Sequence, residues 1–501
     1  MAVVCVDAGT TMVKAVLFDG AGRELGVARE ATPVRRDASG ASEQDMWAVW
    51  EAVVSAIRAV RRSHPEPVEL LALTGQGDGC WLVDENGDPT GPAILWNDAR
   101  AAGVLERWDA DGVLTDAFRI NGTLGFPGTS AAILRWLHEH QPERLRASHQ
   151  ALYCDGWLFS RLTGALAVDE SDAANPFLDI RTRTYSPRLL ELFGMPWARR
   201  LLPPVRGDGN RVEKLCPRAA AQLGLPAGLP VVMAPFDIPA TAIGMGAVAP
   251  GDACTVLGTT LSTEVVLAEP DTSGEPAGML LPSGVARTYV RSLAAMAGVE
   301  VIGWGMRLLG LDQPSWLSDL AAAADPGSGG LVFHPYLSPA GERAPFRDSA
   351  ARGGLIGLSS THSRAEVARA ILEGTCCAVR DCLEFTAMVP TELRLCGGGA
   401  ASQFWCQLLA DVTGVPTSRS TDAEVGAKGA LIAALVATGQ EPDTASASKR
   451  LVRRQLTFEP DPAVVVRYHD LYADFVATRE ALAPQWPRLA RAGARRSGDG
   501  G

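Results

Sequence analysis

The sequence contains few of the features that mark zinc, disulfide or membrane proteins. Ten cysteines are scattered over 501 residues without a CxxC pair, which argues against a zinc framework or a disulfide scaffold. Seven dispersed histidines add no metal-ligand spacing. The longest strongly apolar helical run, at 430–439, has about half the length of a bilayer span. We therefore expect free thiols, a cytoplasmic location and no membrane partner.

Basic residues are also outnumbered. The chain has 46 Lys and Arg against 57 Asp and Glu, a net charge of −11. Nucleic acids and anionic membranes are bound by basic surfaces, so we expect neither partner. The first residues run directly into the strand-like AVVCVD without a targeting segment. This composition favours a globular protein and does not exclude a phosphorylated small molecule as a ligand, and a homodimer is the assembly that we consider.

The familiar phosphate-binding loops are missing. No GxxxxGK[ST] occurs, so the chain has no P-loop. GQGDG at 75–79 is followed by strand-like CWLV, and GMGAVA at 244–249 follows a predicted helix. Neither glycine run has the strand–turn–helix context of a dinucleotide-binding fingerprint. A Rossmann dehydrogenase is therefore disfavoured.

What the sequence does contain is an internal repeat. VVCVDAGTTMVKAVLF at 3–18 and ACTVLGTTLSTEVVL at 253–267 share an apolar strand, a Gly-Thr-Thr turn and a second apolar strand. A repeat about 250 residues long predicts two similar halves. The composition turns to Gly, Ala and Pro near 244–251, where we expect the boundary.

The two Gly-Thr-Thr turns have a binding and a purely structural interpretation. Backbone N–H groups and hydroxyls at a concave turn bind phosphate oxygens, and Lys14 can add a positive charge. Asp7, just before the first turn, can hold Mg²⁺ through water. A plain hairpin uses Gly and Thr for turn geometry and β propensity alone. Because two matched turns occur, one with an acid and a lysine, we favour phosphate binding.

Hydrophobic periodicity predicts the other main elements. We expect an antiparallel meander over the first thirty residues, and helices at 45–64, 364–386, 402–413, 424–439 and 462–482. Lys428 is expected to be solvated, and 486–501 to be a flexible tail.

Ten segments together resemble one known family. In chain order they are VDAGTT, EQDMW, TGQGDGCWLVDENGDP, ILWNDAR, LFSRLTG, APFDIPATAIGMGAV, VLGTT, GERAPF, GGLIGLSSTHSRAEVARAILEG and LCGGGAASQFWCQLLADVTGVP. The chain resembles the FGGY family of carbohydrate kinases from residue 2 to about residue 485.

This resemblance implies an α/β, two-domain actin-like (ribonuclease H-like) ATPase fold. Each domain would be a mixed sheet flanked by helices, with a cleft between the domains. Residues 1–246 would form the N-terminal domain with the sugar or polyol site, and residues 247–485 the nucleotide-binding C-terminal domain. The implied reaction is transfer of the γ-phosphoryl group of ATP, with Mg²⁺, to a hydroxyl of a sugar or polyol.

The resemblance also assigns roles to single residues. The phosphate contacts would be Gly9, Thr10, Thr11 and Lys14 in the first turn and Gly258, Thr259 and Thr260 in the second. The adenosine pocket would be lined by Gly398, Gly399, Ala400 and Gln403. Asp7 and Asp237 would lie near the magnesium ion.

Asp237 matches the catalytic base of the family. An attacking hydroxyl must lose its proton, and a positioned carboxylate can take it. FDIPATAIG also reads as a helix start with Asp237 as the N-cap. The two roles are compatible because a capping carboxylate stays ionised and fixed.

The candidates for binding the acceptor are Gln76, Asp78, Trp96, Asp98 and Asp237, and Arg100 is a further candidate. Amide and carboxylate groups suit hydroxyls, and an indole ring packs on the C–H face of a polyol. The alternative is a hairpin with glycines at its bend and Trp96 in the core.

The acceptor segments depart from those of several relatives. D-xylulose kinases typically have Gly-Gln-Met-His-Gly and glycerol kinases Arg-Glu, where this chain has Gly77-Asp78. Ile238-Pro239 stands where many members have Asn or Gln. These variants are most similar to members acting on four- or five-carbon polyols and unusual ketoses. We expect a tetritol such as erythritol, with a ketopentose of the xylulose or ribulose type as the alternative.

Two further classes of function share this fold. A nucleotide-binding sugar sensor without turnover would have lost Asp237 or the threonine turns, and both are present. A mechanical actin-like or chaperone-type ATPase would carry polymerising or peptide-binding insertions, which the sequence does not indicate. An enzyme is therefore favoured.

Overall fold

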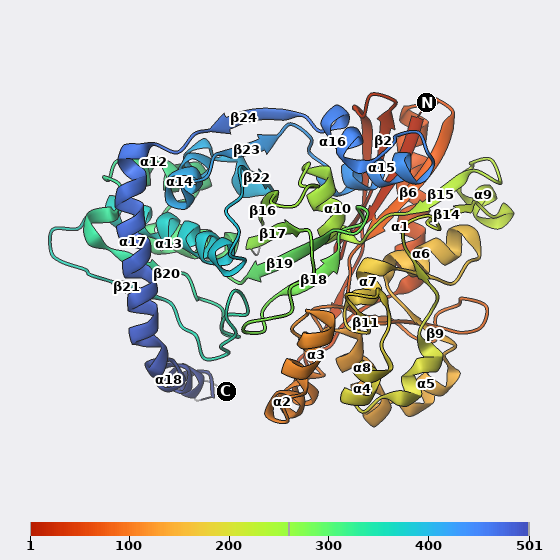
Figure 1. The fold of residues 1–501 in the computed structure, drawn as a ribbon, viewed down its shortest axis with the longest axis horizontal. Coiled ribbons are helices and arrows are strands. Elements are labelled where there is room, and N and C mark those ends of the chain that lie inside the picture. The colour runs from red at the N-terminus through yellow and green to blue at the C-terminus, as the bar shows by residue number, and fades with distance from the viewer. Residues whose placement is uncertain (1, 259–260, 499–501) are drawn as a thin grey trace. The chain divides into compact units, whose positions relative to one another are not determined.

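The computed structural model describes residues 2–258 and 261–498. The chain divides into two compact units (Figure 1). The first consists of Met1–Pro250, Val266–Val290 and Asp422–Val452, and the second of Gly251–Val265, Arg291–Thr421 and Arg453–Gly501. The first segment of the first unit thus ends close to the expected boundary at residue 246. The unit also includes two later segments, which a division of the chain into two halves does not predict.

A six-stranded sheet with the order β14-β15-β6-β1-β2-β3 organises the first unit. Its strands are β1 (Ala2–Ala8), β2 (Met12–Asp19), β3 (Glu24–Ala31), β6 (Val68–Gly75), β14 (Val212–Lys214) and β15 (Pro230–Met233). The first three form the predicted antiparallel meander, and β6 runs parallel to both β1 and β15. This order brings the end of β1 beside the end of β6, where the candidate residues lie.

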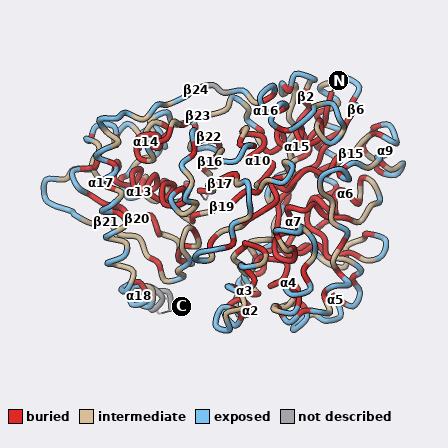
Figure 2. Tube along the Cα trace, viewed as in Figure 1, coloured by how far each residue is buried: buried red, intermediate tan, exposed pale blue. Residues whose placement is uncertain are grey.

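Both faces of this sheet are covered, as the buried strands in Figure 2 show. Successive side chains of a strand point to opposite faces. Val4 and Val6 of β1 pack with helix α1 (Met46–Ser63), and Val3 and Cys5 pack with helix α15 (Val425–Ala437). Asp7 follows the alternation of Val3 and Cys5, so it lies on the face that α15 covers.

The smaller elements complete this unit. Its other strands are β4 (Arg35–Arg36), β5 (Ser42–Gln44), β7 (Trp81–Val83), β8 (Ala93–Ile94), β9 (Gln150–Leu152), β10 (Val168–Asp169), β11 (Leu178–Asp179), β12 (Thr184–Tyr185), β13 (Val205–Arg206) and β18 (Met279–Pro282). Its other helices are α2 (Ala102–Ala110), α3 (Val113–Asn121), α4 (Ser130–His140), α5 (Pro142–Ala147), α6 (Cys154–Thr163), α7 (Glu170–Ala174), α8 (Pro187–Leu192), η1 (Pro196–Leu201), α9 (Pro217–Leu223), α10 (Asp237–Gly244) and α16 (Thr444–Leu451).

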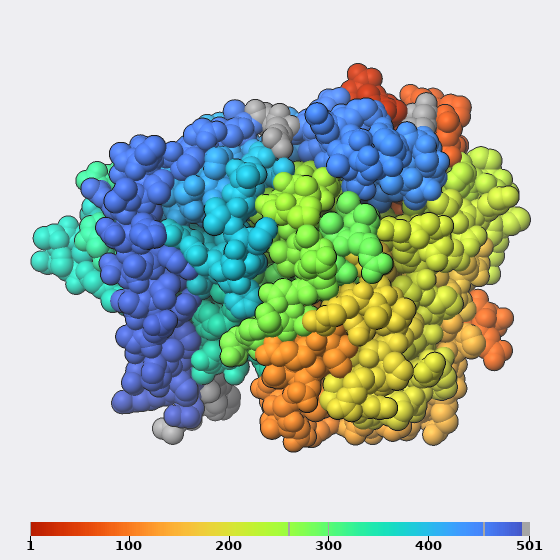
Figure 3. Space-filling model, in the orientation of Figure 1, coloured from red at the N-terminus to blue at the C-terminus, as the bar shows by residue number. Residues whose placement is uncertain are grey.

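Helix α15 confirms the prediction at 424–439 but corrects the expectation for Lys428. Figure 3 shows the segment that carries α15 and α16, in blue, beside the red N-terminal residues. Lys428 is completely buried: its Nζ lies 3.0 Å from Asp422 Oδ1, donates to the carbonyl of Gly22 and stands 4.9 Å from the Phe18 ring centroid. A buried ammonium is tolerated here because an acid and a carbonyl replace water.

Helices α10 and α15 cross in direct backbone contact. A Cβ atom on Gly244 would lie 1.8 Å from the Val425 carbonyl oxygen, and one on Gly429 would lie 1.8 Å from the Ala240 carbonyl oxygen. Only glycine fits at both positions. Gly429 therefore packs against a helix, whereas Gly426 is the glycine that approaches strand β1.

The second sheet repeats the first and confirms the predicted repeat. Its order is β18-β19-β17-β16-β22-β23-β24. As in the first sheet, an antiparallel hairpin, β16 with β17, lies beside a parallel strand, β22. The strands of this unit are β16 (Ala253–Leu257), β17 (Leu261–Leu267), β19 (Tyr289–Ala295), β20 (Val332–His334), β21 (Gly354–Ile356), β22 (Leu393–Cys396), β23 (Thr417–Ser420) and β24 (Arg454–Phe458).

The helices of the second unit confirm the predicted helices at 364–386, 402–413 and 462–482, but a helix replaces part of the predicted flexible tail. They are α11 (Val299–Leu309), α12 (Pro314–Ala322), η2 (Ser328–Gly330), α13 (Arg364–Phe385), η3 (Gly398–Ala401), α14 (Gln403–Thr413), α17 (Pro462–Leu482), η4 (Ala483–Gln485) and α18 (Trp486–Gly498). Helix α18 stands where the sequence predicted a flexible tail. Trp486 anchors its start, because the buried indole stacks on Phe346 at 5.9 Å.

The composition led to expectations about the cysteines and about membrane-spanning helices. The ten cysteines are all free, and nine of them are buried. Among residues 2–258 and 261–498, no helix is long and apolar enough to cross a bilayer.

We expect Gly429→Ala to destabilise the first unit. The added methyl group would force α10 and α15 apart, at a cost of about 3 kcal/mol or more. Thermal and urea unfolding should show a lower midpoint. Gly103→Ala, on the exposed side of α2 with open space around it, is the matched control and should be neutral or stabilising by up to about 1 kcal/mol. An unchanged midpoint for Gly429→Ala would contradict the crossing.

Candidate active site

The first Gly-Thr-Thr turn is joined by hydrogen bonds to the predicted acceptor loops. Gly9 N donates to Met12 O at 3.1 Å and closes the turn between β1 and β2. Thr10 Oγ1 donates to Gln76 Oε1 at 2.8 Å and accepts from Trp96 Nε1 at 3.0 Å. The Thr10 hydroxyl therefore connects a residue predicted to bind phosphate with two residues predicted to bind the acceptor.

Gln44 completes this network, and sequence reasoning missed it. Its Nε2 donates to the Thr10 carbonyl oxygen at 2.9 Å, and its Oε1 accepts from Gln76 Nε2 at 3.1 Å. Thr32 Oγ1 also donates to the Thr10 carbonyl, at 3.1 Å. These contacts leave Thr10 firmly held, whereas Thr11 beside it is exposed.

Asp7 and Lys14 face each other across β1 and β2. They are register partners, and Lys14 Nζ lies 3.8 Å from Asp7 Oδ2. Their side chains are 17% and 32% exposed. Burial raises the pKa of Asp7, and the charge of Lys14 opposes this increase. Both groups are thus accessible at the end of the turn, as phosphate and magnesium contacts require.

Asp78 has a strained backbone and a fixed carboxylate. Its φ is +56°, in the left-handed region that few non-glycine residues adopt. Asn175 Nδ2 donates to Asp78 Oδ1 at 2.5 Å, and Tyr153 Oη donates to the Asn175 carbonyl at 3.0 Å. Strain of this kind persists where the surroundings impose it, which is common at functional sites. No sequence signal marks Asn175.

Phe236 brings the acceptor loop next to Asp237. A Cβ atom on Gly77 would lie 2.4 Å from the Phe236 ring, so the ring packs directly on the loop. Phe236 N donates to Ser171 Oγ at 3.2 Å. Asp78 and Asp237 therefore flank a close Gly77–Phe236 contact.

Asp237 begins helix α10 and is half-buried. The N-cap position belongs to Phe236 and has no side-chain capping bond, so the interpretation of Asp237 as the N-cap is wrong by one residue. A carboxylate in the first turn is stabilised in its ionised form by the helix dipole. This is the form that a proton acceptor needs.

The Asp98 carboxylate already accepts hydrogen bonds from its own loop and from strand β5. Its carboxylate accepts from Ser42 N at 2.8 Å and from Arg100 Nη2 at 2.7 Å. Arg100 also pairs with Glu43 at 2.9 Å. These contacts give buried Asp98 a role in holding the loop that carries Trp96, and its prediction as an acceptor ligand stays a prediction.

A buried pair of carboxyl groups lies near Asp78. Apart from contact with each other, Oδ2 of Asp155 and both oxygens of Asp172 have no hydrogen-bond partner among the described residues. Burial raises the pKa of Asp155 to about 7 and that of Asp172 well above its usual range, and the charge of Asp78 raises the latter further. A pair of this kind shares one proton near neutral pH.

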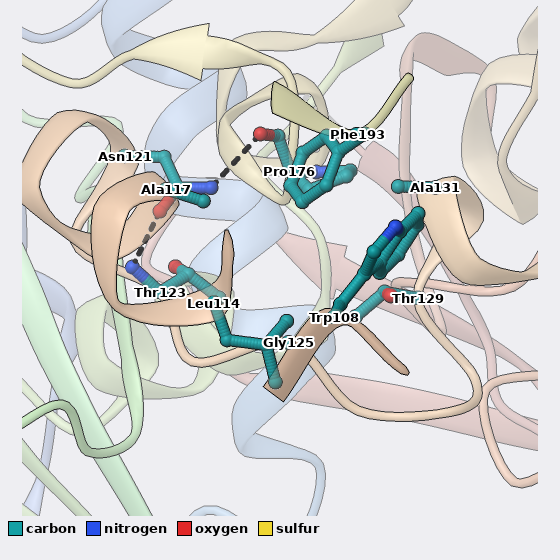
Figure 4. A pocket seen from close by; sticks show the side chains of 10 residues that line it. All are labelled: Trp108, Leu114, Ala117, Asn121, Thr123, Gly125, Thr129, Ala131, Pro176 and Phe193. Atoms are coloured by element: carbon teal, nitrogen blue, oxygen red, sulfur yellow. Dashed lines mark hydrogen bonds between the residues drawn. The ribbon is translucent and has the colours of Figure 1, made fainter. Parts of the chain in front are cut away.

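Pro176 is one of the residues that line a small cavity (Figure 4). The cavity has a volume of about 10 Å³ and is lined by Trp108, Leu114, Ala117, Asn121, Thr123, Gly125, Thr129, Ala131, Pro176 and Phe193. Asn121 Nδ2 donates to the Pro176 carbonyl at 2.9 Å at its edge. A space of this size holds at most about one water molecule, so it is not a sugar site.

The second turn is described only in part. Strand β16 ends at Leu257 and Gly258 follows it, whereas Thr259 and Thr260 lie outside the described residues. In the same unit, a Cβ atom on Gly399 would lie 2.6 Å from the Trp405 ring and 2.8 Å from Leu257 Cβ. The missing side chain of Gly399 therefore leaves room for Trp405 and Leu257 to pack beneath the turn.

The other adenosine candidates differ in exposure. Gly398 has open space where a side chain would be, Ala400 is buried, and Gln403 is exposed at the start of α14. Of these positions, Gly398 is the one at which the missing side chain leaves the backbone open to a ligand.

A buried acid lies next to the second turn. Glu264 on β17 is 1% exposed and accepts from Cys254 Sγ at 3.3 Å and Ser262 Oγ at 3.3 Å. Burial raises the pKa of Glu264 to about 8. The acid is therefore largely neutral at neutral pH.

The described residues include no group of three or more His, Cys, Asp or Glu that could hold a metal ion. Magnesium in phosphoryl-transfer sites needs only one or two carboxylates, with substrate oxygens and water as the other ligands. The partly exposed Asp7 fits that requirement.

Comparisons with known proteins match both units. The N-terminal domain of the FGGY family of carbohydrate kinases matches residues 2–244, and its C-terminal domain matches residues 253–438. The chain belongs to the FGGY family of carbohydrate kinases. It is therefore a phosphotransferase, and the kinase family implies ATP as the phosphoryl donor.

Individual members of the family are similar over nearly the whole chain. Erythritol kinase of Brucella abortus is 32% identical, covering 97% of this chain and 98% of that protein. Xylulose kinase of Escherichia coli is also 32% identical, covering 87% and 90%. A xylulose kinase structure from Lactobacillus acidophilus aligns with a TM-score of 0.92 at 23% identity over 97% of this chain and 99% of that chain. The predicted actin-like fold and the prediction of an enzyme are thus confirmed. The family favours a kinase over the two alternatives, a sugar sensor without turnover and a mechanical ATPase.

Glu264 should make stability fall as pH rises. Its folded pKa of about 8 lies above the ordinary value of 4.5, so its neutral form stabilises the fold fully below pH 4.5. That contribution is lost progressively up to about pH 8. Glu264→Gln should flatten this part of the profile of unfolding midpoint against pH. An equally steep decline in the variant would show that other groups are responsible.

Asn175→Ala should weaken acceptor use. It removes one charge-assisted hydrogen bond from the buried Asp78 carboxylate, a loss of about 1.5–3 kcal/mol. We expect kcat/KM for the acceptor to fall about 10- to 150-fold, with little change in KM for ATP. Asn86→Ala, at an exposed turn of the same unit, is the control. Equal losses for both substrates would point to misfolding.

Proposed function

We propose that this kinase transfers the γ-phosphoryl group of ATP to a hydroxyl of a tetritol such as erythritol, with Asp237 as the general base. The observation that carries this proposal is the contact of Thr10 with Gln76 and Trp96. It joins the phosphate turn to the acceptor loop within one compact unit.

The similarity to an erythritol kinase supports the tetritol. So does the acceptor loop, in which Asp78 replaces the histidine typical of D-xylulose kinases. A fixed carboxylate accepts hydrogen bonds from two neighbouring hydroxyls of a polyol and has no need of a carbonyl group. The indole of Trp96, held through its Nε1 by Thr10, offers an apolar face to C–H groups.

Asp237 would take the proton of the attacking hydroxyl as the oxygen bonds to phosphorus and the bond to the leaving ADP breaks. A base of this kind contributes about 10²- to 10⁴-fold to the rate. The proton passes to solvent after the phosphorylated product leaves. Asp237 lies in the first turn of α10, where the helix dipole favours an ionised carboxylate.

The turn residues would hold the nucleotide. The N–H groups of residues 9–11 and the Lys14 ammonium would contact phosphate oxygens, with Gly258–Thr260 and Gly398 as the corresponding contacts of the second unit. Asp7 would hold Mg²⁺ through water, and the ion would neutralise charge on the phosphates. Positioning and charge neutralisation supply most of the catalysis in phosphoryl transfer.

A ketopentose acceptor is the second candidate. Xylulose kinases reach the same 32% identity as the erythritol kinase.

The ten free cysteines, nine of them buried, support the proposal of a reducing, cytoplasmic location.

We expect ADP release with one acceptor in a panel of erythritol, threitols, arabitols, xylitol, ribitol, glycerol and both series of ketopentoses. Asp237→Asn should bind ATP normally but lose at least about 100-fold in kcat. Asp443→Asn, the same change at the N-terminus of α16, is the control and should keep wild-type turnover.

The outcomes separate the parts of this proposal. Turnover with a ketopentose but not a tetritol would replace the substrate and leave the mechanism. Wild-type turnover in Asp237→Asn would rule out this residue as the base.

A further inference from the structure

Glu424 lies next to the proposed phosphate turn, although about 410 residues separate it from that turn in the sequence. It occupies the N-cap position of α15 and is 5% exposed. Its Oε2 lies 2.8 Å from Lys14 Nζ, and its Oε1 pairs with Arg29. A buried acid has therefore been brought to the phosphate-binding lysine by the packing of α15 on the first sheet.

The charges around Glu424 form an ordered row. Asp7, Lys14 and Arg29 are register partners on β1, β2 and β3. Glu424 lies over this row and bonds to both of its cations. The four groups carry two positive and two negative charges, so the row is neutral when all are ionised.

Within this row, Lys14 has two competing carboxylates. Its Nζ is 2.8 Å from Glu424 but 3.8 Å from Asp7. Charge-assisted hydrogen bonds of good geometry lie at about 2.7–2.9 Å, so Glu424 is the dominant partner. Burial tends to lower the pKa of Lys14, but Asp7 and Glu424 together raise it. The lysine is thereby kept charged.

The start of α15 also approaches Asp7 directly. A Cβ atom on Gly426 would lie only 3.3 Å from Asp7 Oδ2. The backbone N–H of Glu424 donates to Glu24 Oε1 at 3.2 Å, which fixes the helix start on strand β3. Glu424 therefore has a fixed backbone from which to hold Lys14.

We infer that Glu424 is a positioning residue of the nucleotide site: it holds the Lys14 ammonium away from Asp7, so that Lys14 points to phosphate and Asp7 stays available to a hydrated divalent cation. Without Glu424, Asp7 is the remaining carboxylate within reach of Lys14. An ion pair between the two would occupy both groups that the nucleotide and the cation need. This inference rests on the proposed role of Lys14 and Asp7 at the phosphates.

The test compares Glu424→Gln with the wild-type chain. We expect KM for ATP and the Mg²⁺ concentration at half-maximal rate each to rise about tenfold, because a loss of this kind is typical of one charge-assisted bond. KM for the acceptor should not change. ADP binding without acceptor, measured by calorimetry at several Mg²⁺ concentrations, should weaken in parallel and does not depend on turnover. Glu424→Asp should recover part of the loss.

Two further variants separate the possible failures. Glu441→Gln removes another ion pair of the same segment, with Arg450, and should leave nucleotide binding unchanged. The double variant Lys14→Met/Glu424→Gln should bind ADP no more weakly than Lys14→Met alone, because Glu424 acts through Lys14.

Three results would overturn the inference. They are wild-type nucleotide and Mg²⁺ dependence in Glu424→Gln, equal losses for both substrates with a lower unfolding midpoint, and additive losses in the double variant. If Lys14→Met itself binds ADP normally, the proposed phosphate role of the turn fails first, and the positioning role fails with it.

Discussion

The arrangement of the first unit depends on the crossing of α10 and α15, where glycines bring two helix backbones into contact. Each helix begins at a candidate site residue: Asp237 is the first residue of α10, and Glu424 occupies the N-cap position of α15. The crossing therefore fixes the distance between the helix that presents the proposed base and the helix that reaches the phosphate turn. A side chain at either glycine would separate them and disturb both ends of the site.

Around that crossing, the sheet determines which groups can meet. β1 and β6 are parallel neighbours, so the loops that follow them lie together. The first carries the Gly-Thr-Thr turn and the second carries Gln76 and Asp78. Parallel strands that end at one edge are a common way to assemble a ligand site, because the chain leaves every strand at the same level. Thr10 converts this proximity into direct hydrogen bonds.

Several buried ionic groups of this unit have a compensating neighbour. Lys428 has Asp422, Asp98 has Arg100, and the carboxyl groups of Asp155 and Asp172 share a proton. Isolated buried charges would cost several kcal/mol. Asp7, Lys14 and Asp237, in contrast, are only partly buried.

The sequence by itself determined the repeat, the meander, the principal helices and the family, because strand and helix periodicities are local and ten ordered motifs are specific. It also predicted a phosphate role for the first turn, an acceptor role for the loops with Gln76 and Trp96, and a base in Asp237. Only the tertiary structure decided that Lys428 is buried, that Asn175 holds Asp78, that Gln44 braces Thr10 and that Glu424 reaches Lys14. These contacts join residues between 34 and 410 positions apart, and no local pattern records them, since a side chain's partner depends on how separate elements pack.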